Sequence, residues 1–296
     1  MRRLCCTLVA LLVPIMACTM RTGSSSSSDK IPWSADFENG DLTKWYYPST
    51  GKFGDFGGGE YDSGTPGVNS LFSVASQEVA HSGLWSDKLS ITTPNATGGA
   101  SRARMFRWRE SRNPAYFASG LYYSVWLFIP QLYTVNGPNQ FWNLFQFKSK
   151  HPCSSGTCTD PSWFLNVQNR TPKTATPMYI QLVWSCEATI PGPFQGDGLG
   201  CKNYQSSVKQ DLPVGQWIHL ELYLKQNTAT NGSDNYDGRL TIWQDGVLLF
   251  DMVNVATKYA DGDQQWSVNL YSDGLVPNPS YIYIDDPAES TTRIGP

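Results

Sequence analysis

The sequence predicts an all-β fold, a two-sheet antiparallel jelly-roll sandwich, and three observations support this prediction. Short alternations of apolar and polar residues recur along the 296-residue chain. The 26 Gly and 19 Pro fall between them, as expected for turns that join short strands. Aromatic residues make up 13% of the chain and favour pleated sheets. From residue 31 onward the sequence contains no long segment of helical period, second linker or internal repeat, so we expect one domain over residues 31–296.

The clearest predicted strand begins at Trp217, where an apolar side chain recurs at every second residue up to Leu224. A period of two places one face of a strand against the core. Residues 239–250 predict a hairpin that turns at Gln244-Asp245-Gly246. Similar alternation predicts further strands over residues 121–129, 141–148, 163–168, 178–184, 266–273 and 281–285.

The first residues have the pattern of a signal peptide. Arg2 and Arg3 precede an apolar stretch over residues 4–16, which is too short for a membrane-spanning helix. Ile15-Met16-Ala17-Cys18 resembles the lipobox of bacterial lipoproteins. We therefore expect an exported protein whose signal peptide is residues 1–17 and whose lipidated Cys18 anchors it to the membrane, at the cell surface or in the periplasm. An ordinary secretory signal cut near Ala17 is the alternative. Residues 18–30 contain an unbroken run of five serines and predict a flexible tether.

Charge and cysteine content restrict the classes of function. The formal charge is −3 without a basic run, which excludes a nucleic-acid-binding protein. Four of the seven cysteines lie in the predicted domain, and in an oxidising compartment an even number favours two disulfides. We prefer the local pairs Cys153 with Cys158 and Cys186 with Cys201. A four-cysteine zinc site is the alternative, although the spacing fits paired zinc ligands poorly.

Several predicted strands carry aromatic and amide side chains opposite their apolar residues. In residues 141–148 the apolar set Phe141, Phe145 and Phe147 places Trp142, Gln146 and Lys148 on the other face. If the strands are neighbours, this face suits sugar, because aromatic rings cover the apolar faces of pyranoses while amides and cations bind hydroxyls and carboxylates. An ordinary solvated sheet face, or one covered by a loop, is the alternative. In the other strands the corresponding side chains are Asn269, Tyr271 and Asp273, then Tyr122, Ser124 and Trp126, then Tyr179 and Gln181.

Six short motifs occur in the order of a known family. They are Asp36-Phe37-Glu38-Asn39-Gly40-Asp41 before Trp45, His81-Ser82-Gly83, SVWLFIP over residues 124–130, Gln146-Phe147-Lys148, Gly215-Gln216-Trp217 and Trp243-Gln244-Asp245-Gly246. Together they resemble the concanavalin-like jelly-roll polysaccharide lyases, namely the heparin lyase I-like and the glucuronan and alginate lyase group. The resemblance implies cleavage of a uronic-acid-containing polysaccharide by β-elimination, without a required cofactor. Non-catalytic lectin-like and laminin-G-like domains share much of this pattern, so a carbohydrate-binding protein is the alternative.

The resemblance also implies roles for individual residues. Gln146 matches a glutamine that neutralises the substrate carboxylate, and Tyr271 matches a catalytic tyrosine. Lys148 stands where the family has a histidine, and Ser267 stands where it has a lysine. The family's arginine-rich strand corresponds to the region containing Arg102, Arg104, Arg107 and Arg109, and the sequence leaves open which arginine faces the cleft. The expected contacts with substrate are Trp142, Trp126, Tyr122, Asn269, Gln181 and Tyr179.

Elimination across C4 and C5 of a uronate needs a group that neutralises the carboxylate, a base for the C5 proton and an acid for the leaving oxygen. A phenol is a poor base at neutral pH, so Tyr271 requires a nearby cation such as Lys148 or Arg104. A structural tyrosine packed on the sheet is the alternative. The protein without residues 1–17 has a formal charge of −5, so a polyanionic substrate requires local clustering of such cations.

Other chemistries find little support. The Glu-x-Asp-x-Glu pattern of laminarinase-like hydrolases is absent, and no Ser/His/Asp or Cys/His arrangement indicates acyl transfer. Similarity to carbohydrate-binding sandwiches implies a structural calcium ion held by Asp286 with Glu38 or Asp36 between the first and last strands. The alternative is a strand end whose carboxylates bind backbone groups.

Overall fold

The structure is a computed structural model that describes residues 33–45, 58–63, 71–92, 101–108, 120–153, 156–184, 202–228, 236–258 and 264–296. The predicted signal peptide, Cys18, the tether, Arg109, Cys186 and Cys201 lie outside the described residues, as do the side chains of Cys153 and Cys158. Export, lipidation and both disulfides therefore stay predictions. Within the described part, no helix is long and apolar enough to cross a membrane.

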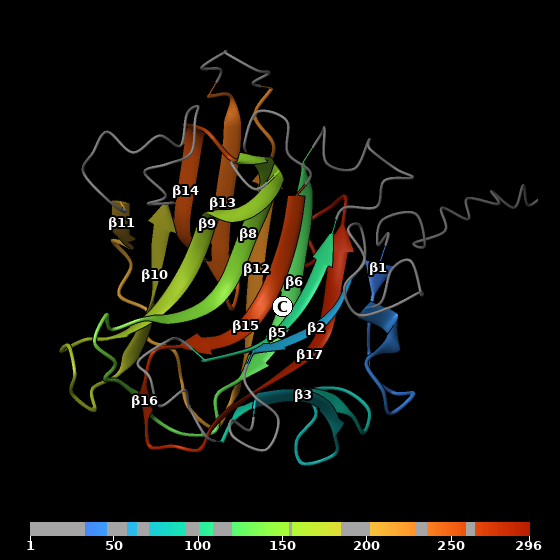
Figure 1. Ribbon diagram of the computed structural model, residues 1–296, viewed down its shortest axis with the longest axis vertical. Helices are drawn as coiled ribbons and strands as arrows, with labels where there is room; N and C mark the ends of the chain where they lie inside the picture. The colour runs from blue at the N-terminus through green and yellow to red at the C-terminus, as the bar shows by residue number, and fades with distance from the viewer. Residues whose placement is uncertain are drawn as a thin grey trace, which may run out of the picture.

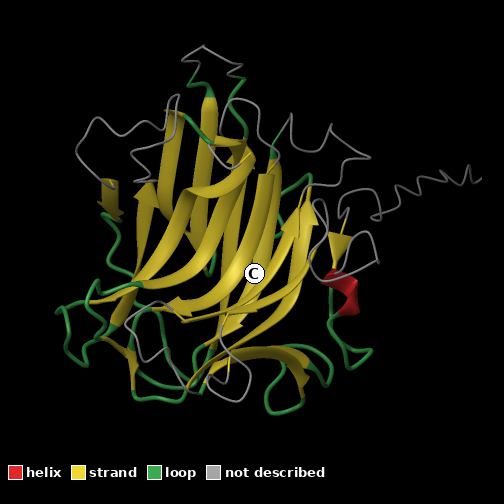
Figure 2. Cartoon of the chain, viewed as in Figure 1, coloured by secondary structure: helices red, strands yellow, loops and turns green. Residues whose placement is uncertain are grey.

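Two antiparallel sheets face each other and form the predicted jelly-roll sandwich (Figures 1 and 2). Sheet A consists, in spatial order, of β14 (Val247–Val255), β13 (Gly238–Gln244), β12 (Trp217–Lys225), β6 (Leu121–Phe128), β17 (Ser280–Ser290), β4 (Ser86–Ile91) and β3 (Leu71–Ser76), with β1 (Trp33–Ser34) on β17. Sheet B consists of β11 (Lys202–Gln205), β10 (Met178–Trp184), β9 (Gly156–Asn169), β8 (Trp142–Cys153), β15 (Gln264–Ser272), β5 (Ser101–Trp108) and β2 (Gly58–Ser63). A small pair joins β7 (Thr134–Val135) to β16 (Leu275–Val276), and the described helix is the short 3-10 turn η2 (Thr43–Trp45).

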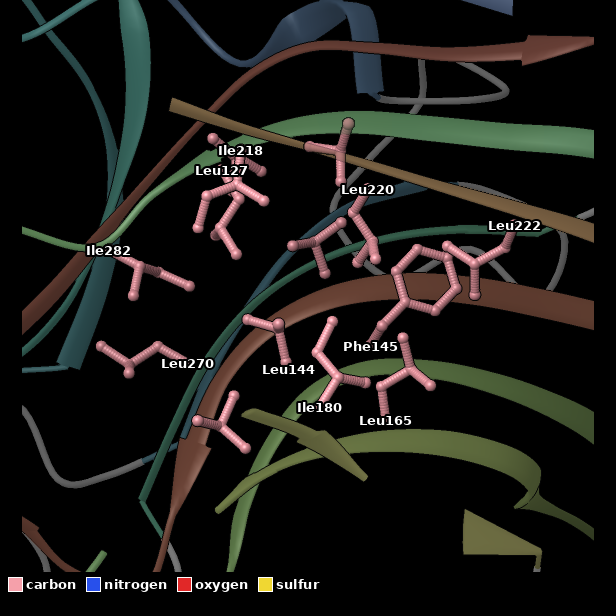
Figure 3. Close-up of a cluster of buried hydrophobic side chains, with 14 of the residues drawn as sticks. Leu127, Leu144, Phe145, Leu165, Ile180, Ile218, Leu220, Leu222, Leu270 and Ile282 are labelled. Carbon is pink, nitrogen blue, oxygen red and sulfur yellow. The ribbon is translucent and has the colours of Figure 1, made fainter. Parts of the chain in front are cut away.

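The apolar faces of the two sheets meet in one core (Figure 3). The predicted strand at Trp217 is β12, and its alternate residues Ile218 to Leu224 are buried as the pattern requires. Burying such side chains is the main stabilising contribution to a sandwich, at about 1.5–3 kcal/mol each. In Figure 3 side chains from sheet A (Leu127, Ile218, Leu220, Leu222 and Ile282) approach those from sheet B (Leu144, Phe145, Leu165, Ile180 and Leu270).

The predicted hairpin is confirmed as β13 and β14. Its turn residues Asp245 and Gly246 both have positive φ, at 50° and 76°. Positive φ at both central residues is the geometry of a type I′ turn, whose twist matches that of the flanking strands. Asp-Gly at this position therefore predicts the hairpin turn from the local sequence alone.

A β-bulge in β8 reverses part of the predicted alternation. Asn143 pairs with Asn166, but Phe145 pairs with Leu165, so Leu144 is the extra residue. Trp142 and Leu144 consequently point into the core on the same side as Phe145. The expectation that Trp142 contacts substrate is wrong, because its side chain is 0% exposed.

Candidate functional site

A cleft of about 800 Å³ lies on the outer face of sheet B, the face turned away from the core. Four strands of sheet B, namely β11, β10, β9 and β15, supply side chains to it, and two loop segments form one end. Its lining consists of Asn139, Gln140, Phe141, Phe164, Asn166, Gln168, Asn169, Arg170, Pro172, Tyr179, Gln181, Val183, Asn203, Gln205, Tyr271 and Asp273. A cleft lined by several neighbouring strands has room for an extended chain such as a polysaccharide.

A row of amide side chains crosses the sheet beneath the cleft. Asn269 donates from Nδ2 to Asn143 Oδ1 at 2.7 Å, and Asn143 donates from Nδ2 to Asn166 Oδ1 at 3.4 Å. The strand register continues the row from Asn166 to Gln181 on β10 and Gln205 on β11. Asn143 and Asn269 are fully buried, so the expectation that Asn269 contacts substrate is wrong, whereas Gln181 is half-buried and Gln205 is exposed. Amide groups present both donors and acceptors, as sugar hydroxyls require.

Arg104 extends this row onto β5 but is 5% exposed. Its Nε donates to Asn269 Oδ1 at 2.8 Å, and its Nη2 donates to Ser267 Oγ at 3.0 Å and Gln265 Oε1 at 3.2 Å. These bonds hold the guanidinium within the sheet surface. Arg104 therefore orients Asn269 and does not line the cleft.

Tyr271 on β15 is half-buried and lines the cleft. Its ring packs edge-on against Phe141, with 4.7 Å between the ring centres. The guanidinium carbon of Arg102 lies 5.3 Å from the centre of the Tyr271 ring, on the directly opposite position of β5. On the other side of β15, Asn143 stands opposite Tyr271. Tyr271 thus has a cation on one side and an amide on the other.

The wall beside Tyr271 is fixed by Asp273. Its two carboxylate oxygens accept the backbone N–H of Asn139 at 2.6 Å and of Phe141 at 2.9 Å. Because these bonds hold the segment before β8 against the end of β15, the Phe141 ring stays packed against Tyr271. Asp273 is therefore a positioning residue in this structure.

Gln146 and Lys148 share the outer face of β8 with Asn143 but lie far from Tyr271. Gln146 stands opposite Ser267, four residues along β15 from Tyr271, which is about 13 Å at about 3.3 Å per residue. Lys148 stands opposite Gln265, about 20 Å away by the same spacing. The structure does not bring these two residues to Tyr271. Among the described residues, the cation found over the Tyr271 ring is Arg102, which the sequence placed only within the arginine-rich strand.

Trp126 and Tyr122 belong to sheet A, so the expectation that they share a surface with Tyr271 is wrong. Their strand β6 pairs with β12 and β17, and both side chains lie on the outer face of that sheet. Trp126 stacks on His81 with 3.8 Å between the ring centres, and Tyr122 packs against Tyr223 with 4.8 Å between the ring centres. Tyr179 and Gln181, in contrast, line the cleft.

The carboxylates proposed for calcium are held by protein groups. Glu38 accepts the backbone N–H groups of residues 84–85 at 2.9 Å each. Asp286 lies 2.8 Å from Nδ1 of His81 and accepts a hydrogen bond from Oγ of Ser82 at 2.9 Å. Asp36 pairs with a lysine. Within the described ranges, no three His, Cys, Asp or Glu residues come together as metal ligands, so this set does not fit calcium. It fits the alternative of carboxylates that fix a loop to the strand ends.

The comparison with known proteins identifies the fold. No protein-family profile matches the sequence, and no curated protein matches it significantly. Among solved structures, the endo-β-1,4-glucuronan lyase of the fungus Trichoderma reesei is 18% identical, with a TM-score of 0.55 over 88% of this chain and 96% of its own. The alginate lyase Aly36B is 15% identical, with a TM-score of 0.51 over 90% of this chain and 100% of its own.

A third match is the alginate lyase of family PL-14 from Aplysia kurodai, 12% identical, with a TM-score of 0.50 over 88% of this chain and 99% of its own. The chain has the jelly-roll fold of these polysaccharide lyases. At such low identity the likeness concerns the fold alone. The chemistry therefore depends on the side chains of this cleft.

Proposed function

We propose that this protein is a polysaccharide lyase that cleaves a uronic-acid-containing polymer by β-elimination. The observation that supports the proposal most strongly is the position of Tyr271, half-buried in a cleft that crosses sheet B, with Arg102 over its ring and the amide row beside it. The solved structures that share the fold include lyases of glucuronan and of alginate, which are uronate polymers.

The residues supply the functions that the reaction needs. Asn166, the cleft-lining member of the amide row nearest to Tyr271 in the strand register, donates to the substrate carboxylate and makes the C5 proton more acidic, as Gln146 was expected to do. The Tyr271 oxygen acts as a phenolate and takes the C5 proton, with the Arg102 guanidinium over its ring. The electrons of that C–H bond form the C4–C5 double bond as the C4–O bond breaks. The phenol then returns its proton to the departing oxygen.

One tyrosine serves as both base and acid in this scheme. Among the cleft-lining residues that the structure describes there is no histidine, and both oxygens of Asp273 already accept N–H groups. A single group acts on one face of the sugar ring. The scheme therefore favours uronates whose C5 hydrogen and C4 oxygen lie on the same face, such as glucuronate and mannuronate.

The test is the ultraviolet absorbance of unsaturated uronate after incubation with glucuronan, alginate, heparin or pectate. We expect Tyr271→Phe to lower the rate about 100-fold or more, because the phenol oxygen carries the proton in both steps. Tyr122→Phe is the matched control, since it removes a phenol from sheet A and should retain the parent rate.

A non-catalytic carbohydrate-binding protein is the second candidate. It is favoured by the dispersal of the expected set, because Lys148 lies about 20 Å from Tyr271. If no polymer yields an unsaturated product, yet one binds with equal affinity to the parent and to Tyr271→Phe, the lyase proposal fails and this candidate replaces it.

A further inference from the structure

Arg170 follows directly after β9 and lines the end of the cleft away from Arg102. Its Nε donates to Asp211 Oδ1 at 2.7 Å, and its Nη2 donates to the carbonyl of Gln210 at 3.1 Å. Its guanidinium carbon lies 4.4 Å from the centre of the Tyr179 ring. These contacts fix the plane of the guanidinium before any ligand arrives, which lowers the entropy lost on binding.

The remaining donors of this arginine are available to a ligand. The hydrogen bonds to Asp211 and Gln210 use Nε and Nη2, and neither involves Nη1. The ion pair with Asp211 is exposed to solvent, with 33% and 49% of the two side chains accessible. Exposed ion pairs contribute little, so Asp211 positions Arg170 without preventing it from binding a second carboxylate.

Arg170 is also the single cationic side chain among the described residues that line the cleft. A uronate polymer carries a carboxylate on every acidic sugar, whereas the whole chain has a formal charge of −3. Attraction of such a polymer must therefore come from local cations. Guanidinium groups suit this role because they match the planar geometry of a carboxylate.

This cation lies several sugar rings away from the reacting tyrosine. Tyr179 is on β10, three strands from β15, and neighbouring strands are about 4.8 Å apart, which gives about 14 Å across the sheet. The pairing of Tyr179 with Gln168 places it further along the strands than the amide row. A ligand that contacts both Tyr271 and Arg170 must therefore be an oligomer.

We propose that Arg170, held by Tyr179 and Asp211, forms a distal subsite that binds the carboxylate of a uronate several residues away from the bond cleaved. The inference rests on the proposed function and adds to it a determinant of chain length and charge. Because the subsite contacts the substrate far from the reacting atoms, it contributes to binding equally in the ground state and the transition state. Its loss should raise KM without changing kcat.

The experiment uses the full-length protein with the uronate polymer that the parent cleaves and with its shortest cleavable fragments. We expect Arg170→Ala to raise KM for the polymer about 10-fold, as for loss of one solvent-accessible charge contact, while kcat is unchanged. The shortest fragments do not reach the subsite, so their KM should be equal for parent and variant. Carboxyl-reduced polymer should likewise bind parent and variant equally.

The matched control is Arg239→Ala. Arg239 also pairs with an aspartate, at 2.8 and 2.9 Å from Asp251, but it lies on β13 of sheet A. It controls for the loss of an exposed ion pair and should leave KM at the parent value. Arg170→Lys keeps the charge without the planar fork and should give an intermediate KM.

The two proposals can fail separately. An active parent whose polymer KM is unchanged in Arg170→Ala overturns the subsite and leaves the lyase standing. If the parent binds a polymer without cleaving it, the dissociation constant replaces KM, and a 10-fold weaker affinity in Arg170→Ala supports the subsite on a binding protein. A parent that neither cleaves nor binds any uronate polymer overturns both proposals.

Discussion

At the scale of single residues, the alternation of side chains in the sequence placed Tyr271, Asn269, Tyr179 and Gln181 on one sheet face, and the structure confirms that placement. The alternation could not place Trp142. The bulge beside Trp142 inserts one residue, so the residues that precede the bulge face the opposite side of the sheet from the one predicted. Asn143 was missed for the same reason. A bulge depends on the partner strand, so no local pattern reveals it.

Arg102 is predicted to assist Tyr271. Its guanidinium lies over the Tyr271 ring, where a positive charge favours the proposed transfer of a proton to and from the phenol oxygen. Arg102→Ala should therefore lower kcat about 10-fold, with Arg102→Lys retaining part of the rate, as measured by unsaturated product formation. An unchanged kcat in Arg102→Ala would remove this residue from the mechanism.

At the scale of elements, β17 shows how two adjacent carboxylates fix a loop to a strand, which was the alternative to a calcium ion. Asp285 is fully buried and accepts the backbone N–H groups of His81 at 2.8 Å and Ser82 at 3.2 Å. Its neighbour Asp286 binds the side chains of the same two residues. This pair fixes the segment before β4 onto the last strand, a contact between residues about 200 positions apart in the sequence.

Asp285 should make stability depend on pH. Burial, together with the Asp286 carboxylate, raises the pKa of Asp285 to about 6 from an ordinary value of 3.8. The folded state therefore binds this proton more tightly than the unfolded state does. Its contribution is most favourable below about pH 4 and is lost as the pH rises through about 6. Over this pH range the free energy of unfolding should decrease by about 3 kcal/mol because of Asp285.

Urea unfolding of the parent and of Asp285→Asn between pH 4 and 7 measures this effect. We expect the free energy of unfolding of the parent, relative to the variant, to decrease as the pH rises over this range. The variant also loses an acceptor, which shifts its stability at every pH, so the slope of the difference is the quantity to compare. A flat difference would contradict the raised pKa.

At the scale of the whole molecule, the C-terminal tail covers part of the outer face of sheet A. Glu221 is 0% exposed and accepts the backbone N–H groups of Ile294 at 2.6 Å and Gly295 at 3.3 Å. It also accepts from Nε of Arg293 at 3.0 Å. The alternation predicted that Glu221 faces away from the core, and it does, but the tail buries it.

Removal of residues 293–296 should destabilise the fold, because it leaves the Glu221 carboxylate without these donors. We expect the free energy of unfolding in urea to fall by about 2 kcal/mol. The rate of product formation should be unchanged, since the tail lies on sheet A and the cleft on sheet B. An equally stable truncated chain would show that water replaces the tail as the partner of Glu221.

The sequence by itself determined the all-β class, the hairpin at Asp245-Gly246 and the inner and outer residues of most strands. These features follow from local chemistry, namely the two-residue period of a strand and the φ angles that Gly and Asp tolerate.

Only the tertiary structure decided which strands are neighbours, and hence which residues meet. β15 lies between β5 and β8, so Tyr271 meets Arg102 and Asn143, whereas β6 carries Trp126 and Tyr122 to the other sheet. Strand pairing depends on burying every apolar face at once, and many pairings satisfy the same local pattern. The site is therefore a property of the complete sandwich, because no single segment contains it.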